Sequence, residues 1–136
     1  MTTVNEFPWL VGIAYSSDEI IFCGGALIAS KWVVTASHCL YADIPVSASD
    51  LRVILGEYDL STVNEEYLPR RVLRISLILL HYYYDSVTMH NDIALLKVAE
   101  VVDMNIYAPV CLPPPDLDTS GKTAWVYGEY FHTIHL

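Results

Sequence analysis

The feature that most constrains the fold is a series of short, β-favouring runs separated by polar, glycine- or proline-containing segments. The runs are rich in valine, isoleucine, leucine and aromatic residues, which suit the pleated surface of a sheet. They cover residues 10–15, 26–29, 32–35, 51–55, 72–80, 93–98 and 123–127. The intervening segments, which we expect to be turns or loops, are residues 16–18, 23–25, 42–50, 57–69 and 113–121. This pattern predicts an all-β domain, either an antiparallel sandwich or a closed barrel.

The charge of the chain argues against one functional class, the nucleic-acid-binding proteins. The chain has 136 residues, enough for one domain, and its 16 acidic and 7 basic residues give a formal charge of −9. This balance argues against nucleic-acid binding.

Hydrophobic residues make up 54% of the chain, which predicts either a fully buried sheet or an apolar face that binds a partner. The longest apolar stretch, residues 72–80, contains Arg74 and Ser76 and is shorter than the ~20 residues of a membrane helix, so no membrane span is predicted.

The N-terminus and the cysteines give information on the cellular compartment of the protein. Residues 1–6 have neither a basic start nor an apolar core, so no secretory signal is visible. The three cysteines, Cys23, Cys39 and Cys111, allow at most one internal disulfide and leave one sulfur over.

Two segments carry residues suited to acid–base chemistry. His38 directly follows the apolar run 32–35 and stands beside Cys39, while Asp92 immediately precedes the apolar run 93–98. A carboxylate at such a position is costly to bury unless it accepts hydrogen bonds, and a histidine N–H is a suitable donor. The pair therefore predicts a general base and its orienting carboxylate.

Taken together, these motifs resemble the chymotrypsin-like serine proteases. The matching segments are residues 6–9, 23–28, 32–39, 55–59, 91–96, 109–113 and 121–124. They occur in the order of that family from about residue 6 to residue 128. A His-Cys pair alone is weak, but the whole set is highly specific.

The resemblance implies the first of two antiparallel β-barrels, with His38 as general base and Asp92 as its orienting carboxylate. It also implies a disulfide between Cys23 and Cys39, with Cys111 left as a free thiol, and an extracellular location. Ser37 stands where alanine is common in the family, a small change that we expect to be tolerated. A whole domain of this kind needs roughly 200 to 250 residues, so we expect residues 1–128 to form an incomplete domain and residues 129–136 a divergent tail.

The nucleophile is the main departure from the family. The Gly-Asp-Ser-Gly-Gly segment expected to carry the serine and the oxyanion hole is absent from this sequence. Asp118-Thr119-Ser120-Gly121 is a faint echo of it, and we interpret this segment as a turn. The Ile-Val-Gly-Gly start, whose freed amine locks the active site in the family, is replaced by residues 1–5.

Metal sites are not expected from the histidines. His81 and His90 fit solvated loops, and His132 and His135 lie in the tail without a third ligand, so this pattern does not predict a zinc site.

One loop is rich in hard oxygen ligands that could hold calcium. It contains Glu57, Asp59, Glu65 and Glu66. A solvated acidic loop is the better interpretation, and no cofactor is predicted.

The sequence thus predicts a serine endopeptidase represented by its N-terminal half, inactive alone and acting on protein or peptide substrates only if a second barrel is supplied. The alternatives are a non-catalytic binding or regulatory module, and a fragment of an active protease whose second half is encoded elsewhere. We also expect the face that carries His38 and Asp92 to be apolar and to promote self-association.

Overall fold

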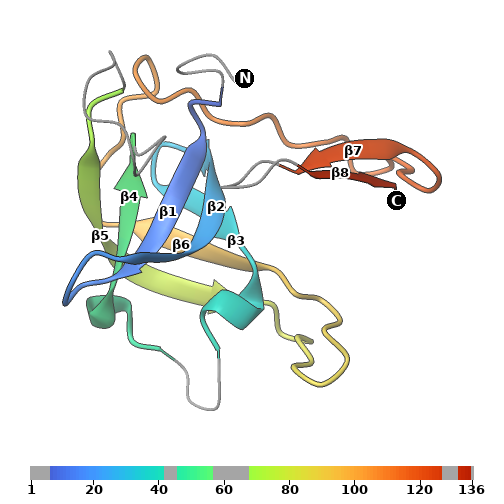
Figure 1. Cartoon of the computed structure of the whole chain (residues 1–136), viewed down its shortest axis with the longest axis horizontal. Coiled ribbons are helices and arrows are strands. Elements are labelled where there is room, and N and C mark those ends of the chain that lie inside the picture. Colours follow the sequence, from blue (N-terminus) through green and yellow to red (C-terminus); the bar gives the residue numbers. More distant parts are fainter. Residues whose placement is uncertain (1–6, 42–45, 57–67, 127–131, 136) are drawn as a thin grey trace.

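The computed structural model describes residues 7–41, 46–56, 68–126 and 132–135 (Figure 1). Short strands dominate it, as the sequence predicts. In chain order the elements are β1 (Leu10–Tyr15), β2 (Ile21–Ala29), β3 (Trp32–Thr35), the 3₁₀ turns η1 (Ser37–Cys39) and η2 (Ala48–Asp50), β4 (Leu51–Leu55), β5 (Arg71–Leu80), β6 (Ala94–Val98), β7 (Thr123–Val126) and β8 (His132–His135).

The first six strands close into a barrel with the order β1-β2-β3-β6-β5-β4 (Figure 1). Every neighbouring pair is antiparallel. Closure leaves none of these strands with an unpaired long edge, which is how such barrels avoid edge-to-edge association. The predicted all-β fold with a single antiparallel barrel of the chymotrypsin type is confirmed.

The barrel interior is filled by aliphatic side chains that alternate along the strands with outward-facing ones. In β6, for example, Ala94, Leu96 and Val98 are buried, whereas Leu95 and Lys97 between them are only half-buried. Other fully buried aliphatic side chains include Ile13, Leu27, Val33, Leu40, Leu51, Val53, Ile54, Leu55 and Leu73. This core makes the barrel a rigid support for the loops at its ends.

The expectation of a turn at residues 23–25 was wrong, because these residues lie inside β2. Gly25 is needed at this position for close packing between strands, and it does not form a turn. A Cβ on Gly25 would lie 2.7 Å from the carbonyl oxygen of Val34 and 3.1 Å from a methyl group of Val33. The absent side chain therefore lets β3 approach β2 closely.

The C-terminal strands form a separate two-stranded sheet in which β7 pairs with β8 antiparallel. This hairpin extends away from the barrel, at the end of a long connection from β6 (Figure 1). β7 is predicted from the sequence, but β8 is not, because it falls in the segment that we expect to be a divergent tail. Its strand conformation arises through pairing with β7, which the composition of residues 132–135 does not signal.

Within the described part of the chain, no helix is long and apolar enough to cross a membrane.

Candidate active site

The turn that carries His38 is held in place by two side-chain hydroxyl groups. β3 ends at Thr35, whose Oγ1 donates a hydrogen bond of 2.8 Å to the carbonyl oxygen of Gly24 in β2. The chain then enters η1, where the fully buried Ser37 donates from Oγ to the carbonyl oxygen of Ile93 at 2.6 Å. Sequence reasoning treated Ser37 as a tolerated change and passed over Thr35. Both side chains are buried and donate to backbone carbonyl oxygens of neighbouring segments, which indicates a positioning role.

Asp92 lies at the end of a loop whose backbone is bent just before it. Asn91 adopts a left-handed conformation with φ 55°, which asparagine tolerates better than most residues. Its side-chain amide donates to the carbonyl oxygen of Tyr83 at 2.9 Å, and its own carbonyl oxygen accepts from the backbone N–H of Ile93 at 2.8 Å. These bonds fix the backbone on both sides of Asp92 and therefore the direction in which its side chain projects.

Strand pairing brings the two predicted residues together. Thr35, the last residue of β3, pairs with Ala94, the first residue of β6. His38 lies just beyond this end of β3, and Asp92 lies just before β6. Although they are 54 positions apart in the sequence, the antiparallel register of β3 and β6 places both at the same end of the barrel.

Asp92 contacts His38 through both of its carboxylate oxygens. Its Oδ2 lies 2.7 Å from His38 Nδ1, and its Oδ1 accepts a hydrogen bond of 2.8 Å from the backbone N–H of His38. The His38 side chain is 50% exposed and that of Asp92 is 21% exposed. The carboxylate is thus enclosed and held at two points, while the outer part of the imidazole faces solvent.

The electrostatic balance at Asp92 favours its charged form. Partial burial by itself raises the pKa of Asp92, but the hydrogen bonds from the His38 ring and backbone, together with the charge of His38 and a bond from the Ser37 backbone, outweigh it. The pKa of Asp92 therefore lies below its ordinary value.

This geometry determines the chemistry available to the imidazole. An ionised carboxylate can only accept hydrogen bonds, so the ring of His38 donates to Asp92 from Nδ1. In the neutral ring the lone pair is then on Nε2. A histidine held in this way can take up a proton at Nε2 and release it again.

Neither neighbouring nucleophilic side chain is available to that nitrogen. Cys39 Sγ lies 3.7 Å from His38 Nε2, but it is bonded to Cys23 Sγ. The hydroxyl of Ser37 is buried and engaged with Ile93. Both groups therefore support the histidine and do not serve as nucleophiles.

The predicted disulfide is confirmed. Cys23 in β2 and Cys39 in η1 are joined across 16 positions, with their Cα atoms 6.1 Å apart, inside the usual range for a disulfide. The bond ties the His38 turn to a barrel strand. Cys111 is free and exposed, as the sequence predicts.

Among the residues that the structure describes, no thiolate metal site is found. In the part of the chain that it describes, the one group of three metal-ligating side chains is Cys23, His38 and Cys39, whose ligand atoms lie within 4.8 Å of one another. Both sulfurs belong to the disulfide and are not thiolates, the form that binds metals. His81 and His90 are exposed on the loop before Asp92. The acidic loop that could hold calcium, with Glu57, Asp59, Glu65 and Glu66, lies outside the described residues.

Comparison with known proteins places these residues in a family. Residues 1–129 match the family model described as Trypsin. The chain is 33% identical to the serine protease filzig of Drosophila melanogaster over 133 residues, which are 93% of this chain and 8% of that protein. It is 34% identical to a venom serine protease of Polistes dominula over 113 residues, 82% of this chain and 39% of that protein.

A vertebrate relative gives the same result. The chain is 36% identical to coagulation factor IX of Oryctolagus cuniculus over 110 residues, which are 79% of this chain and 37% of that protein. The chain thus spans between 8% and 39% of the length of these three relatives. The family match nevertheless covers nearly all of this chain and includes both His38 and Asp92. The chain belongs to the trypsin family of serine proteases.

Proposed function

We propose that this chain supplies the general base and the orienting carboxylate of a serine endopeptidase site. The observation that carries the proposal is the two-point contact between Asp92 and His38, with distances of 2.7 and 2.8 Å. One bond selects the tautomer of the ring, and the other holds the backbone from which the ring projects. This is the role of the carboxylate in a Ser-His-Asp triad.

Each residue has a defined part in the proposed reaction. His38 Nε2 accepts the proton of a serine hydroxyl as that oxygen attacks the peptide carbonyl carbon. The same nitrogen then gives the proton to the leaving amine. Asp92 keeps the ring in the required tautomer and stabilises the positive charge that the ring gains. Ser37 and Thr35 act only by holding the turn.

We also propose that the 136-residue chain hydrolyses no peptide unaided. It contains no Gly-Asp-Ser-Gly-Gly segment. The backbone N–H of Ser120, in the segment that faintly echoes it, donates to Asp118 Oδ1 at 2.9 Å in an exposed turn. That hydrogen bond is typical of a structural Asx turn. A serine nucleophile, an oxyanion hole and a specificity pocket would have to be contributed by a second barrel.

The disulfide supports an extracellular setting for this function. Bonds of this kind persist in oxidising compartments and are rare in the reducing cytosol. We therefore propose that the protein works outside the cell on protein or peptide substrates, when a second barrel is present.

A first experiment asks whether the chain acts alone. The purified protein is incubated with a fluorophosphonate probe, which labels activated serines, and separately with a peptide ester. We expect no labelling and hydrolysis at the rate of buffer. Labelling, or hydrolysis that disappears in His38→Ala, would overturn the proposal of inactivity.

A second experiment tests the roles of His38 and Asp92. The second barrel of a trypsin-family relative, carrying its own Gly-Asp-Ser-Gly-Gly segment, is supplied as a separate polypeptide. We expect hydrolysis by the mixture that is lost with His38→Ala and Asp92→Ala but kept with His90→Ala, an exposed histidine on the same loop as Asp92. Hydrolysis that survives His38→Ala would contradict the assignment of the base.

A further inference from the structure

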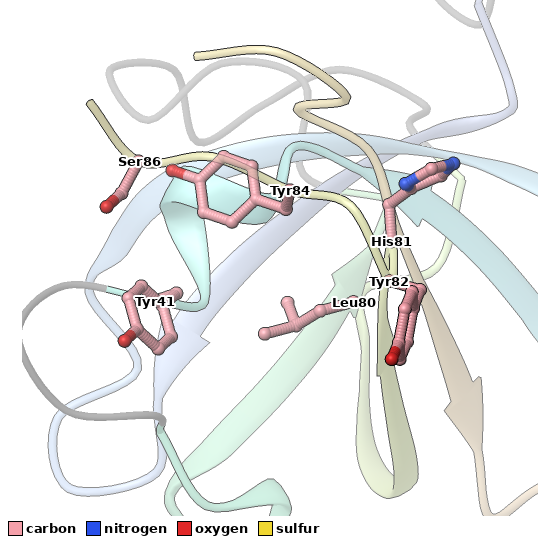
Figure 2. Close-up of a pocket in the computed structure, with 6 residues that line it drawn as sticks. All are labelled: Tyr41, Leu80, His81, Tyr82, Tyr84 and Ser86. Atoms are coloured by element: carbon pink, nitrogen blue, oxygen red, sulfur yellow. The ribbon is translucent and has the colours of Figure 1, made fainter. Parts of the chain in front are cut away.

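A pocket of about 360 Å³ lies beside the segment that carries Asp92 (Figure 2). Its volume is at the lower end of the range for ligand sites. It is lined by Tyr41, Leu80, His81, Tyr82, Tyr84 and Ser86. The wall from His81 to Tyr84 is tied to the active-site loop, because the backbone N–H of His81 donates to the carbonyl oxygen of Ile93 at 3.1 Å and Asn91 bonds the carbonyl oxygen of Tyr83.

Three aromatic rings surround this space from different directions. Tyr41 and Tyr84 meet edge to face, with ring centroids 6.2 Å apart and planes at 81°. Figure 2 shows Leu80 between Tyr41 and Tyr82, with its side chain directed toward Tyr41 and with Tyr84 above it. Tyr82 is 89% exposed, so the pocket opens to solvent on that side. Aromatic faces carry negative charge density and attract cations.

Two carboxylates, those of Asp85 and Asp92, act on the side chain of Tyr84 in the pocket. None of its lining residues is a lysine or an arginine. Asp85 is adjacent to the lining residues Tyr84 and Ser86, and the pKa of Asp85 is lowered by hydrogen bonds from the Val87 backbone and from Thr88. Burial in the first place, and then the negative charges of Asp92 and Asp85, raise the pKa of Tyr84. A cation entering the pocket would therefore meet the field of two carboxylates and no lysine or arginine in the pocket lining.

The imidazole of His81 lies at the edge of the pocket. Its Nδ1 accepts a hydrogen bond of 3.1 Å from the backbone N–H of Tyr83, which ties the ring to its own loop. Figure 2 shows the imidazole directed away from Tyr41 and Leu80. The imidazole forms part of the rim, and the rings of the tyrosines form the binding surface.

We propose that this pocket binds the alkylammonium group of a lysine side chain in a peptide. Leu80 supplies an apolar contact for the methylene stem of the lysine, and the faces of Tyr41, Tyr82 and Tyr84 surround its charged end. An anionic ligand is disfavoured by Asp85 and Asp92, and a neutral ligand would gain nothing from their field. The proposal concerns binding alone, so it can be tested whether or not the chain takes part in hydrolysis.

The test compares two peptides that differ in one charge. Acetyl-Gly-Lys-Gly-amide and the same peptide with an acetylated lysine are titrated into the full chain, and the tyrosine ring resonances are followed by NMR. We expect the lysine peptide to shift the resonances of Tyr41 and Tyr84 with an affinity of about millimolar and the neutral peptide to leave them unchanged. Equal shifts with both peptides would overturn the proposal.

Substitutions locate the binding surface. Tyr84→Leu should weaken lysine-peptide binding about fivefold or more, in line with the loss of a cation–π contact. Tyr82→Leu, at an exposed side chain, should have an effect of the same size. Tyr84→Phe, which keeps the ring and loses the hydroxyl, should bind nearly as the wild type does. Tyr15→Leu is the control, because Tyr15 is 45% exposed and stacks on Phe22 outside the pocket. Unchanged binding in Tyr82→Leu and Tyr84→Leu, or a loss in Tyr84→Phe equal to that in Tyr84→Leu, would contradict the proposed site.

Discussion

The hydroxyl of Ser37 donates a hydrogen bond of 2.6 Å to the carbonyl oxygen of Ile93, across 56 positions of sequence. Ser37 directly precedes His38, and Ile93 directly follows Asp92. The bond therefore joins the two segments that hold the candidate catalytic pair, at a fully buried position. It complements the direct contact between His38 and Asp92, because it fixes the backbone next to each of these two residues.

This relationship predicts a measurable cost for removing the Ser37 hydroxyl. Ser37→Ala removes one of the two donors to the carbonyl oxygen of Ile93, the other being the backbone N–H of His81. Because the lost hydrogen bond comes from a fully buried side chain, we expect the free energy of unfolding to fall by about 1 kcal/mol. The matched control is Ser76→Ala, because Ser76 Oγ makes a similar bond of 3.0 Å to the carbonyl oxygen of Lys97 at an exposed position. We expect that change to cost no more than ~0.5 kcal/mol. Urea denaturation of both variants measures the difference, and equal costs would contradict the positioning role of Ser37.

The tautomer of His38 should depend on Asp92. In the wild type the ring donates from Nδ1 to Oδ2 across 2.7 Å. In Asp92→Asn the amide nitrogen can donate to Nδ1 instead, which moves the ring proton to Nε2 and removes the lone pair needed by a general base. Long-range ¹H–¹⁵N correlation spectra of the imidazole at neutral pH distinguish the two tautomers. An Nδ1–H tautomer retained unchanged in the variant would show that Asp92 does not select it.

The lowered pKa of Asp92 predicts a pH-dependent contribution to stability. A carboxyl group whose folded-state pKa lies below its unfolded value stabilises the fold fully above the unfolded value, and this stability is lost as the pH falls through the folded-state pKa. The unfolding free energy lost in Asp92→Asn should therefore be largest at neutral pH and should shrink as the pH falls below the ordinary value of 3.8. Urea denaturation of both proteins from pH 7 to pH 2.5 measures this loss. A loss that is independent of pH would argue against a charged Asp92 in the folded state.

The disulfide should contribute substantially to stability. Its loop spans 16 positions, for which the chain-entropy model gives about 3 kcal/mol. The double variant Cys23→Ala/Cys39→Ala should lose about that amount in a denaturant titration. Cys111→Ala is the control, because Cys111 is free and exposed and its replacement should stay within ~0.5 kcal/mol. Thiol titration should find one reactive thiol before reduction and two more afterwards, and any other count would contradict the assigned pairing.

The chain should self-associate through the surface next to Asp92. Outside the tyrosine-lined pocket, the loop before β6 exposes several large apolar side chains, namely Tyr83, Val87, Met89 and Ile93. Monomers seldom leave a large contiguous apolar patch uncovered. We expect sedimentation velocity to show dimers or larger species at about micromolar concentration, with binding of an apolar dye and low solubility near the sequence pI of 4.7.

A pair of charge insertions tests where this association occurs. Val87→Asp, at a side chain that is 89% exposed, should shift the protein toward monomer. Ile20→Asp, at a side chain that is 67% exposed in the connection between β1 and β2, should not. A wild-type monomer that binds no dye would contradict the prediction.

Much of the barrel could be predicted from sequence because strand residues report their burial locally. The runs at residues 10–15, 32–35 and 51–55 coincide with β1, β3 and β4, since apolar and β-branched side chains gather where a sheet is buried. The prediction failed where one residue type has two structural uses. Gly24 and Gly25 resembled a turn, yet both lie inside β2, where Gly25 allows close packing against β3.

The identities of His38 and Asp92 as candidate residues also followed from local sequence, because each belongs to a specific motif. Three other features could not be predicted from local sequence: the distance between His38 and Asp92, the burial of Ser37, and the pocket between Tyr41 and Tyr84. These features join segments that are far apart in the chain, and they arise when β3 pairs with β6 and the barrel closes. A hydrogen bond requires its atoms to lie within about 3 Å of each other, and the register of paired strands sets that spacing, whereas the order of residues along the chain does not.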